Sequence, residues 1–293
     1  MDSTQPSYAV VFDTETADIS TDPAKPSLMI EASYLAFQGI ENSSPSLSFH
    51  QRYNPFPPEH RDGPMKAGLM GYGALSTHHI LPSMLLDMPA PETFHLPVGT
   101  LFLIGHNVDY DWNVIQPWHK DCEGLRRIDT LPLCRKAWPG LDAYSQSAVL
   151  YFLADTYPAV LDLHQAKLLL TSAHSSQTDV VICSIILRCL IDHFKPVLWN
   201  DLWKLSEAAR IPATMFFGKH KGMSIQEVPL DYCQWMLKQP DVDPYLRIAM
   251  ERRTTPLPSP TNVSSKPVQY SADNQESFPD GDLCDHVAMS TCR

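Results

Sequence analysis

Three apolar runs rich in β-branched and aromatic residues follow one another near the start of the chain, at Tyr8–Asp13, Leu28–Gln38 and Ser46–Tyr53. Runs of this kind are typical of β-strands. Further strands are expected at Leu101–Gly105 and Ile128–Asp129, and helices at His79–Met88, Asp109–Trp118, Leu131–Trp138, Ser145–Tyr157 and Asp179–Phe194. Strands that come first and then alternate with helices indicate an α/β fold, with a mixed sheet flanked by helices.

The composition changes along the chain in a way that suggests three parts. Residues 1–199 hold the strand and helix pattern, and a second, small α+β unit is expected at residues 200–253. Residues 254–293 contain several Pro and Ser and few large apolar residues, which is typical of a disordered tail.

The bulk properties exclude several classes of protein. No run of eighteen apolar residues is present, and the nearest, Val180–Ile191, carries Arg188, so a buried helix is expected there and not a membrane span. The polar start, Met1–Ser7, predicts no secretory signal. The seven cysteines include no C-x-x-C pair, which argues against a disulfide framework or a zinc ribbon and favours a reducing compartment, expected to be the cytoplasm.

The net charge of −11 argues mildly against nucleic-acid binding through bulk charge. Its distribution softens this argument, because residues 210–253 carry seven Lys/Arg and five Asp/Glu. An acidic domain that collects cations, joined to a mildly basic module, fits an enzyme that binds a nucleic-acid strand elsewhere on its surface, and it also fits many enzymes that never meet DNA.

Acidic residues stand at the end of the first expected strand. Side chains alternate along a strand, so Asp13 and Glu15 point to one face and Thr14 to the other. Two neighbouring carboxylates repel one another, and both stay ionised at low energetic cost only beside a cation. Taken alone, the D-x-E pattern is more often a solvated strand end.

Two further segments carry polar residues at strand or helix ends. Gly105-His106-Asn107-Val108-Asp109-Tyr110-Asp111 follows a buried strand, where α/β proteins commonly place binding groups. Asn107 or Asp109 could cap the next helix, and either Asp109 or Asp111 could serve as a ligand. His174-Ser175-Ser176-Gln177-Thr178-Asp179 favours a helix start, with Asp179 in its first turn and His174 before it.

Together, in this order, D-x-E, H-N-x-x-[FY]-D and H-x4-D resemble the three motifs of the DEDDh 3′→5′ exonuclease superfamily, whose fold is ribonuclease H-like. The resemblance implies a two-cation site with Mg²⁺ or Mn²⁺, and it favours Asp111 over Asp109 because the aromatic Tyr110 precedes it. The implied metal ligands are Asp13, Glu15, Asp111 and Asp179, the implied general base is His174, and Thr14, Thr16, His106 and Asn107 are expected to contact nucleic acid.

Within the superfamily, the chain is similar to the exodeoxyribonuclease X family. Lys136–Leu141, Tyr144-Ser145, and above all Phe217-Gly218-Lys219-His220-Lys221-Gly222 followed by Tyr232 and Trp235-Met236-Leu237, carry this similarity. Lysines on a glycine-bracketed hairpin are well placed for phosphate oxygens, so Lys219 and Lys221 are expected to bind nucleic acid. Tyr232 and Trp235 would share a helix face, and we favour a place in the core of the small domain for Trp235.

These resemblances imply a 3′→5′ exodeoxyribonuclease that acts on single-stranded DNA or on the 3′ ends of duplex DNA, releases 5′-mononucleotides and serves in DNA repair. Three alternatives remain open from the sequence: an exoribonuclease on short RNA, a proofreading subunit of a polymerase, and an inactive nucleic-acid-binding module. Clustered carboxylates would be costly without a use, which argues against the last. No membrane partner is expected.

Overall fold

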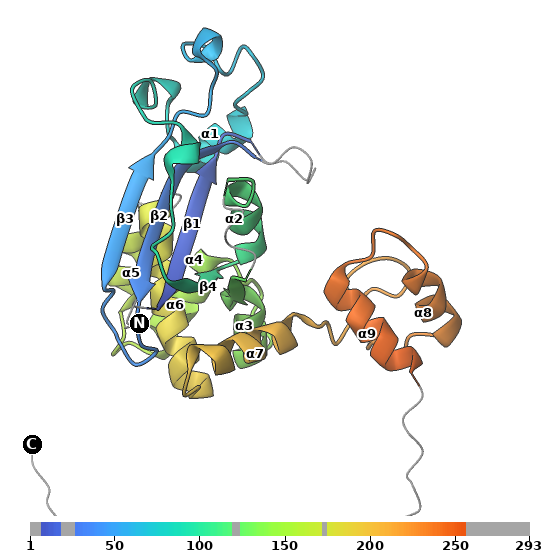
Figure 1. The fold of residues 1–293 in the computed structure, drawn as a ribbon. Helices are drawn as coiled ribbons and strands as arrows, with labels where there is room; N and C mark the ends of the chain where they lie inside the picture. The colour runs from blue at the N-terminus through green and yellow to red at the C-terminus, as the bar shows by residue number, and fades with distance from the viewer. Residues whose placement is uncertain (1–6, 19–26, 119–123, 172–174, 256–293) are drawn as a thin grey trace, which may run out of the picture. The chain divides into compact units, whose positions relative to one another are not determined.

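The computed structural model describes residues 7–18, 27–118, 124–171 and 175–255. Its centre is one five-stranded mixed sheet in the order β3-β2-β1-β4-β5 (Figure 1). The strands are β1 (Tyr8–Thr16), β2 (Met29–Phe37), β3 (Leu47–Arg52), β4 (Thr100–Gly105) and β5 (Arg126–Asp129). β2 pairs antiparallel with both β1 and β3, whereas β4 runs parallel to β1 and β5 parallel to β4. The expected α/β, ribonuclease H-like mixed sheet is therefore confirmed.

The helices are α1 (Tyr72–His78), α2 (Val108–Ile115), α3 (Thr130–Ala137), α4 (Gln146–Thr156), α5 (Leu163–Leu170), α6 (Ser176–Phe194), α7 (Trp199–Arg210), α8 (Leu230–Leu237) and α9 (Pro244–Thr254). Four of the expected helices lie close to their expected positions, as α2, α3, α4 and α6, whereas α1, α5, α7 and α9 were not expected. The helix expected at His79–Met88 is wrong, because α1 ends at His78, its C-cap His79 is in the left-handed region, and only a 3₁₀ turn follows, at Pro82–Met84. A proline lacks the N–H that a continuous helix needs, so it suits the first turn here and not the interior.

β1 is buried on both faces because apolar side chains alternate along it into two different cores. Ala9 and Val11 pack in the cluster that holds the buried side of α6, while Val10 and Phe12 pack in the cluster that holds the buried residues of α2. The alternation continues past Phe12. It directs Asp13 and Glu15 toward the face of α6, and Thr14 toward the face of α2.

The most apolar stretch of the chain, Val180–Ile191, lies within α6 and is largely buried in the first of these cores. The expected buried helix is confirmed there. Among the helices in the described part of the chain, none combines the length and the apolarity needed to cross a bilayer.

Residues 211–254 have a hydrophobic core of their own, and we call them the C-terminal module. Met215, Ile225, Val228 and Met236 form this core with residues of α9. α7, which the sequence analysis assigned to the second unit, instead buries Trp199 and Leu202 in the core on the α6 side of the sheet. The described residues within Met1–Thr254 form one compact unit, so the expected boundary at residue 200 stays a prediction.

Candidate metal centre

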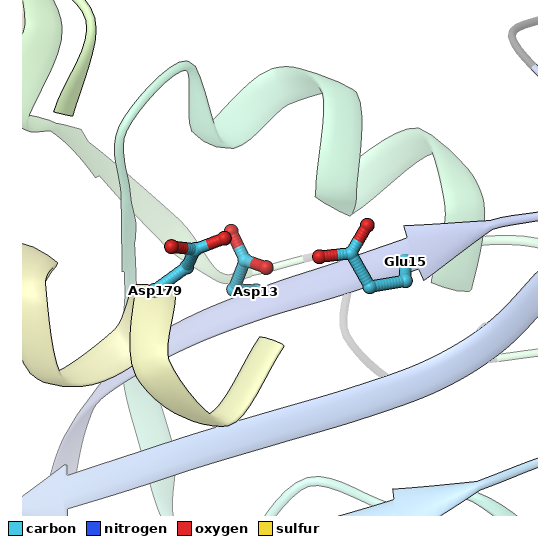
Figure 2. A group of neighbouring side chains, drawn as sticks. All are labelled: Asp13, Glu15 and Asp179. Carbon is cyan, nitrogen blue, oxygen red and sulfur yellow. The ribbon is translucent and has the colours of Figure 1, made fainter. Parts of the chain in front are cut away.

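Three carboxylates meet where β1 ends and α6 begins. Asp13 and Glu15 come from β1, and Asp179 comes from the first turn of α6 (Figure 2). One oxygen of each can be chosen so that all three lie within 4.8 Å of one another. The strand alternation thus brings Asp13 and Glu15 together with an acid more than 160 residues away in the sequence.

The start of α6 is fixed by two hydrogen-bonding groups. Ser175 is the N-cap, and its side chain accepts a hydrogen bond from the backbone N–H of Thr178. Glu31 Oε1 accepts hydrogen bonds from the backbone N–H and the hydroxyl of Ser176, each at 3.0 Å. Its other oxygen accepts from Arg52 Nε at 2.8 Å. Because α6 carries Asp179, these contacts set the position of one member of the carboxylate cluster.

Sequence reasoning missed Glu31, which is fully buried. It lies directly opposite Glu15 in the antiparallel pair of β1 and β2, so both side chains point to the same face of the sheet. The available signal was an acid inside the otherwise apolar start of β2, since a buried charge needs partners. Its partner Ser176 lies 145 residues away, and the spacing of motifs does not reveal such a contact.

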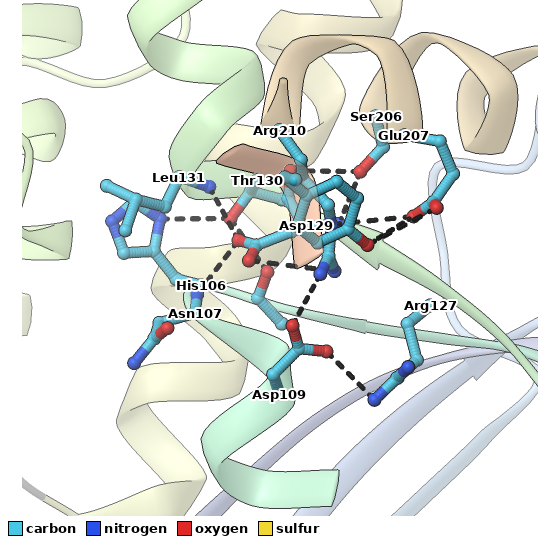
Figure 3. Close-up of polar contacts among 12 residues, drawn as sticks. His106, Asn107, Asp109, Arg127, Asp129, Thr130, Leu131, Ser206, Glu207 and Arg210 are labelled. Carbon is cyan, nitrogen blue, oxygen red and sulfur yellow. Dashed lines mark hydrogen bonds and ion pairs between the residues drawn. The ribbon is translucent and has the colours of Figure 1, made fainter. Parts of the chain in front are cut away.

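The structure places Asp109 and Asp111 in different surroundings. Asp111 is buried, and its Oδ1 accepts hydrogen bonds from the backbone N–H of Thr14 at 2.9 Å and from the Thr14 hydroxyl at 2.7 Å. Asp109 forms ion pairs with Arg127, at 3.0 Å, and with Arg210 (Figure 3). Of the two, only Asp111 is tied to the strand that carries Asp13 and Glu15.

Of the four polar residues expected to contact nucleic acid near the acids, three have side-chain partners within the protein. Thr14 binds Asp111 as described, and the hydroxyl of Thr16 lies 2.6 Å from that of Tyr110. The ring nitrogens of His106 contact the hydroxyl of Thr130, at 2.9 Å, and the carbonyl oxygen of Tyr144, at 2.6 Å. These contacts favour a positioning role for the two threonines and for His106.

Asn107 precedes α2 in the left-handed conformation, with φ of 74°, and its side chain makes no capping hydrogen bond. Its backbone N–H donates to Asp129 Oδ1 at 2.9 Å (Figure 3). Asp129 also caps α3 through the N–H of Leu131. The Asn107 side chain is exposed, so of these four residues it is the one that stays open to a ligand.

The pKa values of three acids in and beside the carboxylate cluster are raised, as expected for buried acids without neighbouring positive charges. Burial raises the pKa of Asp13 well above its usual range, and the nearby Asp111, Asp179 and Glu15 raise it further. Burial and the charge of Asp179 raise the pKa of Glu15 to about 8. Burial also raises the pKa of Asp111 to about 7, although the hydrogen bonds from Thr14 oppose this. Among the described residues, no Lys or Arg forms an ion pair with Asp13 or Glu15.

A divalent cation fits this arrangement. A bound cation favours the ionised form of nearby carboxylates and so removes the repulsion that raises these pKa values. The donor set is made of carboxylate oxygens, which suits hard cations better than it suits zinc. The cluster could therefore hold a divalent metal ion.

The raised pKa of Glu15 predicts how the stability of the metal-free protein depends on pH. Between the ordinary value, 4.5, and about 8, the native state binds more protons than the unfolded state, so the free energy of unfolding falls as pH rises through this window. One pKa unit corresponds to about 1.4 kcal/mol. In chelator, Glu15→Gln is expected to be more stable than wild type at pH 8.5 and to lose less stability between pH 5.5 and 8.5, as measured by urea unfolding.

The control for this measurement is Glu92→Gln, because Glu92 is an exposed glutamate in a 3₁₀ turn away from the cluster. It should leave the pH dependence of unfolding as in wild type. If the free energy of unfolding fell equally with pH in wild type and in Glu15→Gln, Glu15 would not be held in a repulsive carboxylate cluster.

The remaining predicted site residues lie elsewhere or outside the described residues. His174 lies outside them. Lys219 and Lys221 are exposed in the C-terminal module. The structure thus brings together Asp13, Glu15 and Asp179, with Asp111 alongside, and it leaves the geometry of the expected general base untested.

Comparison with known proteins gives structural neighbours only. No protein-family model matches the sequence, and no curated protein matches it. Among solved structures, exonuclease X in complex with 5′-overhanging duplex DNA is 17% identical with a TM-score of 0.45, and the match covers 68% of this chain and 99% of that one. E. coli exonuclease I in complex with a dA16 oligonucleotide is 15% identical with a TM-score of 0.47, and the match covers 71% of this chain and 46% of that one. At this level of similarity, the function has to be inferred from the chain's own residues.

Proposed function

We propose that the protein is a metal-dependent 3′→5′ exonuclease of the DEDDh type that hydrolyses terminal phosphodiesters of DNA and releases 5′-mononucleotides. The observation that carries the proposal is the carboxylate cluster of Asp13, Glu15 and Asp179 at the meeting point of β1 and α6. Acids from the first and third motifs come together there, on a sheet of the type that the motifs imply. The second motif supplies Asp111, which is hydrogen-bonded to Thr14 between the other two acids of β1.

Asp13, Glu15 and Asp179 would hold the cation beside which water attacks, and Asp111, together with Asp13, would hold a second one. When bound, two such cations activate the attacking water and stabilise the leaving oxygen. Asp13 suits the shared position because it lies on the central strand, which is packed on both faces. His174 would accept the proton of the attacking water, and its unperturbed pKa of about 6.5 suits this role near neutral pH.

Two other activities use the same chemistry. An exoribonuclease would need the same carboxylates, since they act on the phosphate and not on the sugar. A proofreading subunit would carry the same site and depend on a polymerase. The lysine hairpin, Phe217–Gly222, favours DNA through its similarity to the exodeoxyribonuclease X family. An inactive binding module would leave the repulsion among Asp13, Glu15 and Asp179 without compensation.

The deciding experiment is nucleotide release from 3′-labelled single-stranded DNA and from RNA of the same sequence, with Mg²⁺, with Mn²⁺ and with chelator. We expect 5′-mononucleotides to be released from DNA with either metal and none to be released in chelator. Release mainly from RNA would keep the mechanism and overturn the substrate. No release from either strand, by a protein shown to be folded, would overturn the proposed activity.

A further inference from the structure

A hairpin in the C-terminal module presents two lysines beside α8. The backbone N–H of Met215 donates to the carbonyl of Met223 at 2.9 Å, and that of Gly222 donates to the carbonyl of Met215 at 2.7 Å. Gly218 and Gly222 have φ of 68° and 84°, which side chains rarely adopt. A Cβ atom at Gly218 would lie 3.3 Å from the hydroxyl of Tyr232, so the hairpin packs closely against α8. Lys219 and Lys221 are therefore held on a defined turn.

The α8 side of this junction presents an exposed tryptophan. Trp235 was expected in the core of the module, but 52% of it is exposed, and this expectation is wrong. It shares the face of α8 with Tyr232, as expected from their spacing, and the two rings lie 5.4 Å apart at 39°. Tyr232 packs against the core and supports Trp235, whose remaining surface is open. A large aromatic residue held in this way is a ready platform for another flat ring.

Polar groups gather around the same rings. An open cavity of about 260 Å³ is lined by Lys219, His220, Pro229, Asp231, Tyr232 and Trp235. His220 is nine-tenths buried, with its ring 4.5 Å from that of Tyr232, and its Nε2 atom has no hydrogen-bond partner among the described residues. An unsatisfied buried nitrogen beside an open cavity is costly unless a ligand or water meets it.

We propose that this cavity binds a nucleobase of single-stranded nucleic acid. The base would stack on Trp235, and its polar edge would contact His220 and Asp231. The phosphate of the same nucleotide would lie near Lys219. The C-terminal module, residues 211–254, carries six Lys and Arg and five Asp and Glu, whereas the whole chain has a net charge of −11, so the module is the better place for a polyanion. Stacking is sequence-tolerant because every base has a π-face, so no particular base is required.

The test measures binding and not hydrolysis, so its outcome is independent of the proposed activity. Fluorescence anisotropy in chelator, where the carboxylate cluster repels phosphates, would give the Kd of the full chain for a labelled oligothymidylate and for an abasic oligomer of equal length. Trp235→Ala is expected to weaken binding of the oligothymidylate by about 5- to 100-fold, as for loss of one stacked base, and to leave the abasic oligomer unaffected. Lys219→Ala should weaken binding of both and reduce the salt dependence.

The variants have matched controls. Tyr72→Ala removes an aromatic residue that is 79% exposed, and Lys238→Ala removes an exposed lysine at the end of α8 that does not line the cavity. Both should bind as wild type does. Trp235→Phe should restore much of the lost affinity, which separates stacking from damage to the fold, and circular dichroism would check the fold of each variant. An unchanged Kd for Trp235→Ala, or an equal loss on the abasic oligomer, would overturn the proposal and favour a protein ligand for this cavity.

Discussion

Asp13→Asn is expected to reduce metal-dependent hydrolysis to undetectable levels while making the metal-free protein more stable at pH 8. Loss of partners that only orient metal ligands commonly costs about 10–100-fold in affinity or activity, so loss of a shared ligand should cost more. The variant also removes one charge from a repulsive group, whose pKa is raised by burial and by Asp111, Asp179 and Glu15. Nucleotide release and thermal unfolding, each with Mn²⁺ and with chelator, measure the two effects.

The two effects together separate a catalytic ligand from a structural residue, because damage to the fold would lower both activity and stability. Mn²⁺ should raise the melting temperature of wild type, since binding at 100 times Kd stabilises by about 2.7 kcal/mol. It should raise that of Asp13→Asn much less. Activity of the variant near the wild-type level would contradict the assignment of this cluster as the metal centre.

Asp109→Asn is the matched control, since Asp109 belongs to the same segment as Asp111 but pairs with Arg127 and Arg210. It should keep its activity and its response to Mn²⁺. Asp111→Asn, by contrast, should behave like Asp13→Asn in the activity assay. The reverse pattern would assign the second-motif ligand to Asp109 and would mean that the ion pairs of Figure 3 break when the metal binds.

The strands and the helices α2, α3, α4 and α6 could be predicted because they depend on local periodicity. Tyr8–Thr16 reads as a strand from its apolar run, and the alternation of side chains then places Asp13 and Glu15 on one face. The helix at His79–Met88 could not be excluded in this way. The residues have the apolar content of a helix, but Pro82 suits only a first turn, and the chain uses it to start a 3₁₀ turn.

Contacts between distant segments account for what the sequence did not reveal. The resemblance favours Asp111 over Asp109, but the contacts that distinguish the two acids involve Arg210, which is 101 residues from Asp109, and Thr14, which is 97 residues from Asp111. The anchoring of α6 depends on Glu31 in the same way. Spacing showed that Tyr232 and Trp235 share a face of α8, but only packing decides whether that face is covered, and Trp235 is left exposed.

His174→Ala is expected to lower turnover by about 10²–10⁴-fold, the usual contribution of a general base, without weakening metal binding. The contact that anchors α6 joins Glu31 to the backbone N–H and the hydroxyl of Ser176, and neither group belongs to residue 174. In wild type, the activity should fall as pH drops through about 6.5, because a protonated imidazole accepts no further proton. Single-turnover rates between pH 5.5 and 8.5 and the Mn²⁺-induced shift in melting temperature measure the two properties.

The control is His164→Ala, which removes an exposed histidine of α5 outside the motifs and should retain wild-type turnover. The residual activity of His174→Ala should no longer show the wild-type fall near pH 6.5. Full turnover in this variant would reject His174 as the base, independently of the results for the carboxylate variants. A variant that loses its response to Mn²⁺ together with its turnover would also contradict the assignment, because a residue that only accepts the proton leaves Asp13, Glu15 and Asp179 able to hold the metal.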